Sequence, residues 1–375
     1  MKFFLCLFLT LLLINSLNSQ FEFNLLSRIN LDKKGENLII SPLSIYQVLS
    51  LTANGAKGET LSEMFYVLRA DTLDEVNQIN YKILSTIKNF KTLEIANGVM
   101  TRFTPLDSFR TIAENYQAPF EPLVSLEQVN NWVNEKTHGK IDKILDYLNP
   151  ETVMLLLNAI YFNGEWTHQF EKELTKSLPF YNFGTEEVMV DTMSQIEYFN
   201  YYEDKKAQII ELKFNEDCMS AIIILPTYLI DINSYVRYLP VSHEEFPNAL
   251  KQLKRTKVHL QLPKFEVNFS EELNQILKDF GMYDAFSPND ADFSGIRKGG
   301  GLYISTAIHK TFLKVHEYGT EAAAVSVIGM DELIYPDDDK IYDMKINRPF
   351  LFFLKNSKLP EGHNLVFMAK IEKID

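Results

Sequence analysis

The sequence is poor in cysteine, with only Cys6 and Cys218 among 375 residues. Cys6 lies in an apolar amino-terminal segment that we expect to be removed, so no disulfide can form within the remaining chain. Cys218 lies just before the apolar run MSAIIILP, where a small buried side chain is expected. The hydrophobic core must therefore hold the fold unaided, and hydrophobic residues make up 46% of the chain, enough to build a large core.

The short motifs of the common enzyme classes are also absent. The sequence contains no G-x-S-x-G, H-E-x-x-H, C-x-x-C or G-x-x-x-x-G-K-[ST] pattern. The segment GAKGET lacks the Gly-Lys-Thr order of a phosphate loop, so a helix end and a turn are expected there. The acids at 337–339 lack EF-hand spacing. The sequence therefore predicts no enzyme, no cofactor and no metal.

Basic residues are fewer than acidic ones, with 37 Lys and Arg against 50 Asp and Glu and a net charge of −13. Such a chain repels nucleic acid and anionic membranes, and it attracts basic partners. Lys82, Lys88 and Lys91 are interspersed with apolar residues, so no basic helix for heparin is expected. We predict partners that are neither nucleic acid, membrane nor heparin.

Residues 1–19 have the layout of a secretory signal peptide, with Lys2, an apolar run from Phe3 to Ile14 and small polar residues near the expected cleavage site. The run is too short for a transmembrane helix. We expect a secreted protein, and an uncleaved first helix is the alternative. Asn268 begins the single N-glycosylation sequon, which is either used or a chance match.

The rest of the chain has no internal repeat, low-complexity tract or Pro/Gly/Ser linker, which favours one domain over residues 20–375. Helical spacing and a Ser-Pro signal indicate two early helices, in QFEFNLLSRI and SPLSIYQVLSLTA. VNNWVNEKTHGKIDKILDYL is typical of an amphipathic helix with a glycine interruption. Later apolar runs such as TVMLLLNAIYF are typical of strands in large sheets. Together these patterns predict an α+β fold.

The segment EYGTEAAA at 317–324 resembles the hinge of the serpin family. The similarity extends in order over nearly the whole chain, which makes it specific. The similar segments are 37–60, 130–141, 157–166, 222–226, 262–273, 280–296, 302–315, 346–354 and 365–371.

The resemblance implies a serpin fold of three β-sheets and about nine helices, with an exposed reactive loop at about 317–345 near the C-terminus. It also implies a monomer that acts as a suicide substrate. The target protease cleaves the loop and forms an acyl-enzyme, and it is trapped when the cleaved loop enters the central sheet as a strand.

The composition of the loop allows such an insertion. Side chains of a strand alternate between its faces, and from 320 to 331 the odd positions carry both acids. The even positions, which we expect to face the core, are uncharged: Thr320, Ala322, Ala324, Ser326, Ile328 and Met330. The stretch is therefore predicted to be a strand that has yet to pair.

By resemblance, the scissile bond lies fourteen residues after the hinge glycine, between Leu333 and Ile334. Leu333 suits the apolar specificity pocket of a chymotrypsin-like serine protease. The nearby acids, including Asp331 and Glu332, should attract a basic protease. Cathepsin G-like enzymes combine both properties and are the expected targets.

The resemblance also implies roles for other residues. Ser41, Ser44, Asn158 and His309 match the shutter beneath the central sheet, and ordinary core packing is the alternative for each. Trp166 matches the breach, where the loop first enters. The hinge comprises Glu317, Gly319, Thr320, Glu321, Ala322, Ala323 and Ala324. Tyr318, where the family often has a charge, and Ala369, where Gly is usual, depart from the pattern.

Two other functions stay open. A non-inhibitory serpin would keep the fold as a binding protein, although the small hinge residues favour an inhibitor. Inhibition of cysteine proteases is the other possibility.

Overall fold

The structure is a computed structural model that describes residues 20–320 and 340–375, except for 89, 91, 216–217 and 242–244. The described part contains nine α-helices and fourteen strands. The helices are α2 (Gln20–Asp32), α3 (Pro42–Ala53), α4 (Gly58–Leu68), α5 (Leu73–Ile87), α6 (Asp107–Asn115), α7 (Leu126–Lys136), α8 (Ile232–Tyr238), α9 (Glu245–Lys251) and α10 (Asn274–Asp279). None of these helices is long and apolar enough to cross a membrane.

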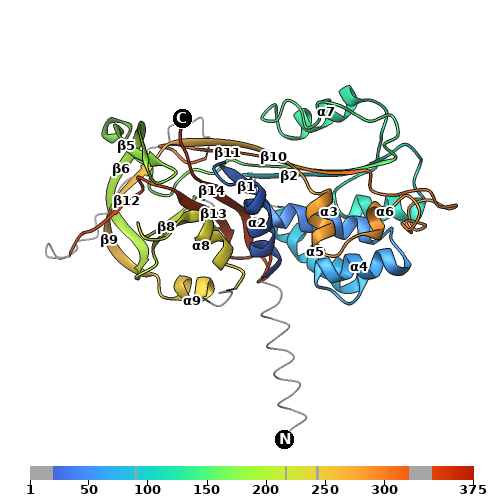
Figure 1. Cartoon of the computed structure of the whole chain (residues 1–375), viewed down its shortest axis with the longest axis horizontal. Coiled ribbons are helices and arrows are strands. Elements are labelled where there is room, and N and C mark those ends of the chain that lie inside the picture. The colour runs from blue at the N-terminus through green and yellow to red at the C-terminus, as the bar shows by residue number, and fades with distance from the viewer. Residues whose placement is uncertain (1–19, 89, 91, 216–217, 242–244, 321–339) are drawn as a thin grey trace, which may run out of the picture.

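Five strands form one sheet in the order β10-β11-β4-β2-β3. Their bounds are β10 (Phe265–Glu272), β11 (Thr306–Val315), β4 (Met154–Phe162), β2 (Leu93–Thr101) and β3 (Glu121–Pro122). In Figure 1, α7 lies on one side of this sheet, and α3 and α5 lie on the other.

The remaining strands form a nine-stranded sheet in the order β1-β14-β13-β8-β7-β6-β9-β12, with β5 also paired to β6. Their bounds are β1 (Leu38–Ile40), β5 (Lys176–Asn182), β6 (Glu186–Glu203), β7 (Ala207–Lys213), β8 (Met219–Pro226), β9 (Lys254–Pro263), β12 (Tyr342–Lys345), β13 (Phe350–Asn356) and β14 (Leu365–Ile371).

We expected three sheets, and the described residues form two. The difference arises from β6, a long strand of 18 residues. Its first part pairs with β5, its middle with β9 and its last residues with β7. One continuous strand thus joins two sheets into a single hydrogen-bonded unit. The predicted α+β class and about nine helices, counted over the described part of the chain, are confirmed.

The Ser-Pro signal marks the start of α3. The Ser41 side chain accepts a hydrogen bond from the backbone N–H of Ser44, and Pro42 occupies the first turn, where its missing N–H is no loss. This start matters because it brings Ser41 beneath the five-stranded sheet.

The expectation of one interrupted helix over 129–148 is wrong in its second half. Helix α7 ends at Lys136, because His138 and Gly139 both adopt positive φ. The segment that follows is held instead by the Asn130 side chain, which accepts hydrogen bonds from the backbone N–H groups of Ile144 and Leu145. The helical spacing there reflects packing against the sheet and not a second helix.

Candidate functional site at the junction of β4 and β11

The centre of the five-stranded sheet is a parallel junction between β4 and β11. Register pairs run from Leu155 with Thr306 to Tyr161 with Phe312. The outer partners of both strands, β2 and β10, run antiparallel to them. Every residue of β4 is buried. The loop that follows β11 therefore leaves from one end of this junction.

At that end the chain reverses in a tight turn. The N–H of His316 donates to the carbonyl of Gly319 (2.9 Å), and the N–H of Gly319 donates to the carbonyl of His316 (3.1 Å). Gly319 has φ +145°, and a Cβ there would lie 2.0 Å from the carbonyl oxygen of Gly164. The hinge glycine is therefore required by both its backbone conformation and the close approach of Gly164.

Thr320 is already part of the sheet end. It is fully buried, and its N–H donates to the carbonyl of Gly164 (2.8 Å), while its hydroxyl accepts from the N–H of Gly164 (2.9 Å). Next to it, Gly319 forms an antiparallel bridge with Glu165. The chain after β11 thus starts back beside the continuation of β4, running antiparallel to it.

Trp166 closes this end from the other side. Its ring stacks on Phe214 with centroids 4.3 Å apart, and its indole N–H donates to the carbonyl of His316 (3.0 Å). Its backbone N–H donates to the carbonyl of Tyr318 (2.9 Å). Trp166 is therefore bound to the turn that follows β11, and its role as the place where the loop enters stays a prediction.

Glu317 is buried in the same turn and paired with a cation from the edge of the sheet. Its carboxylate lies 3.2 Å from the Lys264 ammonium and accepts a hydrogen bond from the Thr175 hydroxyl (2.9 Å). Burial by itself would raise the pKa of Glu317, but its backbone N–H, Thr175 and Lys264 together lower the pKa below the ordinary value. Glu317 is therefore charged at neutral pH, and it links the turn after β11 to Lys264 and Thr175.

A second cluster lies midway along the junction. His309 and Asn158 form a register pair, and His309 Nδ1 bonds to Asn158 Oδ1. His309 Nε2 accepts from the N–H of Ser41 (3.0 Å), so its proton is on Nδ1, and the Ser44 hydroxyl donates to Asn158 Oδ1 (2.9 Å). Asn158 also donates to Asn97 Oδ1 on β2 (2.5 Å). The four predicted shutter residues are thus brought together, across β4, β11 and the start of α3.

Burial lowers the pKa of His309 to about 3. The neutral imidazole is required because Nε2 must accept the Ser41 N–H, and a protonated ring has no acceptor. His309 is fully buried, and both of its ring nitrogens are hydrogen-bonded, as ordinary core packing also requires. Its role in sheet opening stays a prediction.

Several predicted site residues lie outside the described residues: Glu321, Ala322, Ala323, Ala324, Leu333 and Ile334. Asn268 is exposed on β10, the edge strand of the five-stranded sheet. No group of His, Cys, Asp or Glu suited to a metal ion occurs within the described part.

Sequence reasoning did not find Lys264, Thr175, Gly164 or Asn97 as parts of this site. Each meets its partner through a contact between distant segments, such as Asn158 with Asn97, 61 positions apart. No local spacing encodes these contacts. Lys264 lies in the segment 262–273, which resembles the family, so a comparison of that segment residue by residue could have found it.

Comparison with known proteins agrees with this geometry. The family model described as serpin (serine protease inhibitor) matches residues 16–374. Leukocyte elastase inhibitor of Xenopus tropicalis is 31% identical, over 92% of this chain and 96% of the relative. The native-state crystal structure of the thermophilic serpin tengpin has a TM-score of 0.85 and 31% identity, over 96% of this chain and 94% of that one.

A third similarity is to thyroxine-binding globulin in complex with thyroxine. It has a TM-score of 0.82 and 25% identity, over 96% of this chain and 99% of that one. The chain belongs to the serpin family. The family supports protease inhibition in general, and its members are not enzymes.

Proposed function

We propose that the protein is a suicide-substrate inhibitor of chymotrypsin-like serine proteases, with basic, cathepsin G-like enzymes as its targets. The observation that carries the proposal is the end of the β4–β11 junction. There Thr320 is already hydrogen-bonded to Gly164, with the chain heading back beside β4.

A strand that continued from Thr320 between β4 and β11 would run antiparallel to both. It would replace one parallel ladder, of seven register pairs, by two antiparallel ladders. Parallel pairing is slightly less stable per residue than antiparallel pairing, so the exchange favours insertion. About twelve inserted residues at about 0.5–1.5 kcal/mol per backbone hydrogen bond correspond to a stabilisation on the order of 10 kcal/mol.

The choice of target rests on Leu333 and the acids around it. An apolar side chain at the scissile bond contributes about 1.5–3 kcal/mol when buried in a chymotrypsin-like pocket. The acids at 331–332 and 337–339 favour a protease with a basic surface.

The deciding experiment is incubation with chymotrypsin and with cathepsin G, followed by denaturing electrophoresis. An SDS-stable covalent complex is expected, together with a released peptide that begins at Ile334. The Leu333→Arg variant should lose complex with chymotrypsin and gain it with trypsin, whereas Leu333→Phe should keep the chymotrypsin complex. A new N-terminus at Asp331 or Ile341 would show that the scissile bond lies elsewhere.

Thr320→Arg tests insertion separately from recognition. Because Thr320 is fully buried beside Gly164, an Arg there places an unpaired charge at the sheet end before and after cleavage. The variant should be cleaved as a substrate with little complex, while Thr320→Ser, which keeps the hydroxyl, should trap protease like wild type. Equal trapping by the Arg and Ser variants would reject insertion at this junction.

A non-inhibitory binding protein is the second candidate, since one relative of the same fold is named for binding thyroxine. It predicts cleavage without covalent complex for every protease in the panel. Papain in the same panel tests the cross-class alternative.

We also propose that residues 1–19 are removed and that the mature protein is secreted, with Asn268 as its glycosylation site. The exposure of Asn268 supports this use of the sequon. Expression in a eukaryotic secretory cell should release into the medium a protein that begins near residue 20. This protein should lose mass on treatment with a glycosidase specific for N-glycans. The variant Asn268→Gln should have the lower mass from the start.

A further inference from the structure

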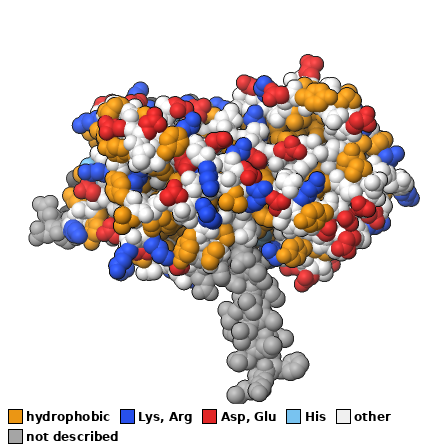
Figure 2. Space-filling view, in the orientation of Figure 1, with side chains coloured by type: hydrophobic (Ala, Val, Ile, Leu, Met, Phe, Trp, Pro, Cys, Tyr) orange, Lys and Arg blue, Asp and Glu red, His pale blue; other side chains and the backbone are white. Residues whose placement is uncertain are grey.

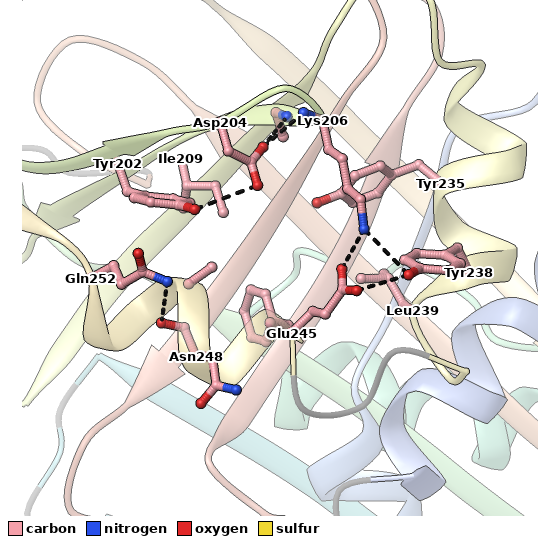
Figure 3. A pocket seen from close by; sticks show the side chains of 13 residues that line it. Tyr202, Asp204, Lys206, Ile209, Tyr235, Tyr238, Leu239, Glu245, Asn248 and Gln252 are labelled. Atoms are coloured by element: carbon pink, nitrogen blue, oxygen red, sulfur yellow. Dashed lines mark hydrogen bonds and ion pairs between the residues drawn. The ribbon is translucent and has the colours of Figure 1, made fainter.

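A pocket on the nine-stranded sheet is separate from the β4–β11 junction. It has a volume of about 300 Å³ and lies between the end of β6, the start of β7 and the helices α8 and α9 (Figure 3). This volume is at the lower end of the range of about 300–1,000 Å³ that is usual for small-molecule sites. The pocket can therefore hold one small molecule.

The floor of the pocket is apolar. Ala207 and Ile209 of β7, Phe246 of α9 and Leu239 after α8 line it and are all buried. Tyr202, Tyr235 and Tyr238 line it with their rings, as Figure 3 shows. A flat apolar group would lose its hydration here without leaving a polar atom of the floor unpaired.

One side of the pocket shows how it holds a cation. The Lys206 ammonium donates to Glu245 Oε2 (2.6 Å) and to the Tyr238 hydroxyl (3.2 Å), and it lies 4.6 Å from the centre of the Tyr238 ring. Glu245 also accepts from the Tyr238 hydroxyl (2.8 Å). A carboxylate, a phenol oxygen and a ring face together surround this ammonium.

The opposite side of the pocket also has a carboxylate, phenol oxygens and ring faces, from Asp204, Tyr202 and Tyr235, but its lining includes no side-chain ammonium. Asp204 Oδ1 accepts from the N–H groups of Lys206 and Ala207, whereas among the described residues Asp204 Oδ2 has only the long 3.5 Å contact with the Tyr202 hydroxyl. The Tyr235 hydroxyl has no hydrogen-bond partner among the described residues and carries no dashed line in Figure 3. Burial, and then the negative charge of Asp204, raises the pKa of Tyr235, so its hydroxyl keeps a proton to donate.

The lining residues of the pocket include two carboxylates, Asp204 and Glu245, and one ammonium, Lys206. An anion entering the pocket would meet this excess of negative charge, whereas a cation would compensate it. The whole chain, at −13, favours the same sign of ligand.

We propose that this pocket binds a small aromatic amine. The ring would lie on the apolar floor against Ile209 and Phe246, and the ammonium would bind Asp204 Oδ2 beside the ring of Tyr202. The Tyr235 hydroxyl would donate to a polar substituent of the ligand. Binding here is independent of the loop and of protease inhibition.

Isothermal titration of the full chain with tryptamine tests the proposal, against two probes of similar shape, indole-3-propionate and 3-indole-ethanol. Tryptamine should bind in the micromolar to low millimolar range, and both analogues should bind at least tenfold more weakly. Equal binding of all three probes, or no tryptamine binding at millimolar concentration, overturns the proposal.

Variants locate the site. Asp204→Asn keeps the oxygen that caps the turn but removes the charge, and it should weaken tryptamine at least tenfold. Tyr235→Phe should weaken a ring-hydroxylated tryptamine severalfold more than tryptamine itself. Asp71→Asn, an exposed position between α4 and α5, changes the net charge equally and should leave the affinity unchanged. If Asp204→Asn and Asp71→Asn bind tryptamine equally well, the ligand is not held at this pocket.

Covalent complex formation with chymotrypsin is measured separately on the same variants. A failure of the pocket proposal can then be distinguished from a failure of the inhibitory function.

Discussion

The strands β8, β13 and β14 and the pair β4–β11 are both buried at the centre of a sheet, yet they are built differently. Every residue of β8 and β14 is buried, and β13 pairs antiparallel with both of them. The pair β4–β11 is parallel, and polar side chains lie in its middle, where His309 meets Asn158.

The difference shows what makes a sheet able to open. Separating β13 from its neighbours would expose apolar side chains to water. It would also break antiparallel pairing, which is already the more stable kind. Separating β4 from β11 breaks a weaker parallel ladder, and a new strand could pair with both edges. On the face shown in Figure 2, acidic and basic side chains are interspersed over most of the surface, and acidic ones gather at its lower right.

Cleavage of the loop should have the largest effect on this comparison. If the cleaved loop inserts between β4 and β11, the gain on the order of 10 kcal/mol should raise the melting temperature by roughly 10–20 °C. Calorimetry of intact and cleaved protein measures it. An unchanged melting temperature after complete cleavage would mean that the junction stays closed.

Phe353→Ala in β13 should cost about 3–5 kcal/mol, because Phe353 is fully buried against Phe23 and Phe246. The cost should be the same in the intact and the cleaved protein, since the nine-stranded sheet does not change. Urea unfolding of both forms measures it. Unequal costs would show that the two sheets rearrange together.

Acid should weaken the junction through His309. Its pKa is about 3 in the folded protein, below the ordinary value of 6.5 that the unfolded chain keeps, so between these values the unfolded chain binds a proton that the folded chain does not. The free energy of unfolding should thus fall as the pH drops below 6.5, by about 3 kcal/mol at pH 4.

The control for this prediction is His309→Gln, which should remove that part of the pH dependence. His363, whose pKa burial lowers to about 4, remains in the variant as a second contributor. Urea midpoints at pH 7 and pH 4 for both proteins provide the comparison, and the same acid sensitivity in both would exclude His309 as a cause.

Glu317→Gln should have the smallest effect, a loss of about 1–3 kcal/mol in the intact protein, because it leaves the Lys264 ammonium without its buried partner. The matched control is Glu266→Gln, whose exposed pair with Lys314 should contribute less than about 1 kcal/mol. Chemical unfolding of the two variants measures the difference. Similar losses would mean that burial of the hinge carboxylate is not what holds the turn.

Local pattern was sufficient for most of the elements. The Ser-Pro signal predicted the start of α3, and the apolar run TVMLLLNAIYF predicted β4. It failed after Lys136, where helical spacing continued but two positive-φ residues ended the helix. Periodicity reports which side chains are buried, and it does not report whether the backbone between them stays helical.

The sequence by itself predicted the α+β class, the start of α3 and the uncharged even positions of the loop. It did so because turn chemistry and strand alternation act over a few neighbouring residues. Only the tertiary structure decided that β4 and β11 lie parallel, that Glu317 meets Lys264 and that Thr320 is already bonded to Gly164. These pairs join segments as far as 156 positions apart, and the packing of whole sheets, not any local preference, brings them together.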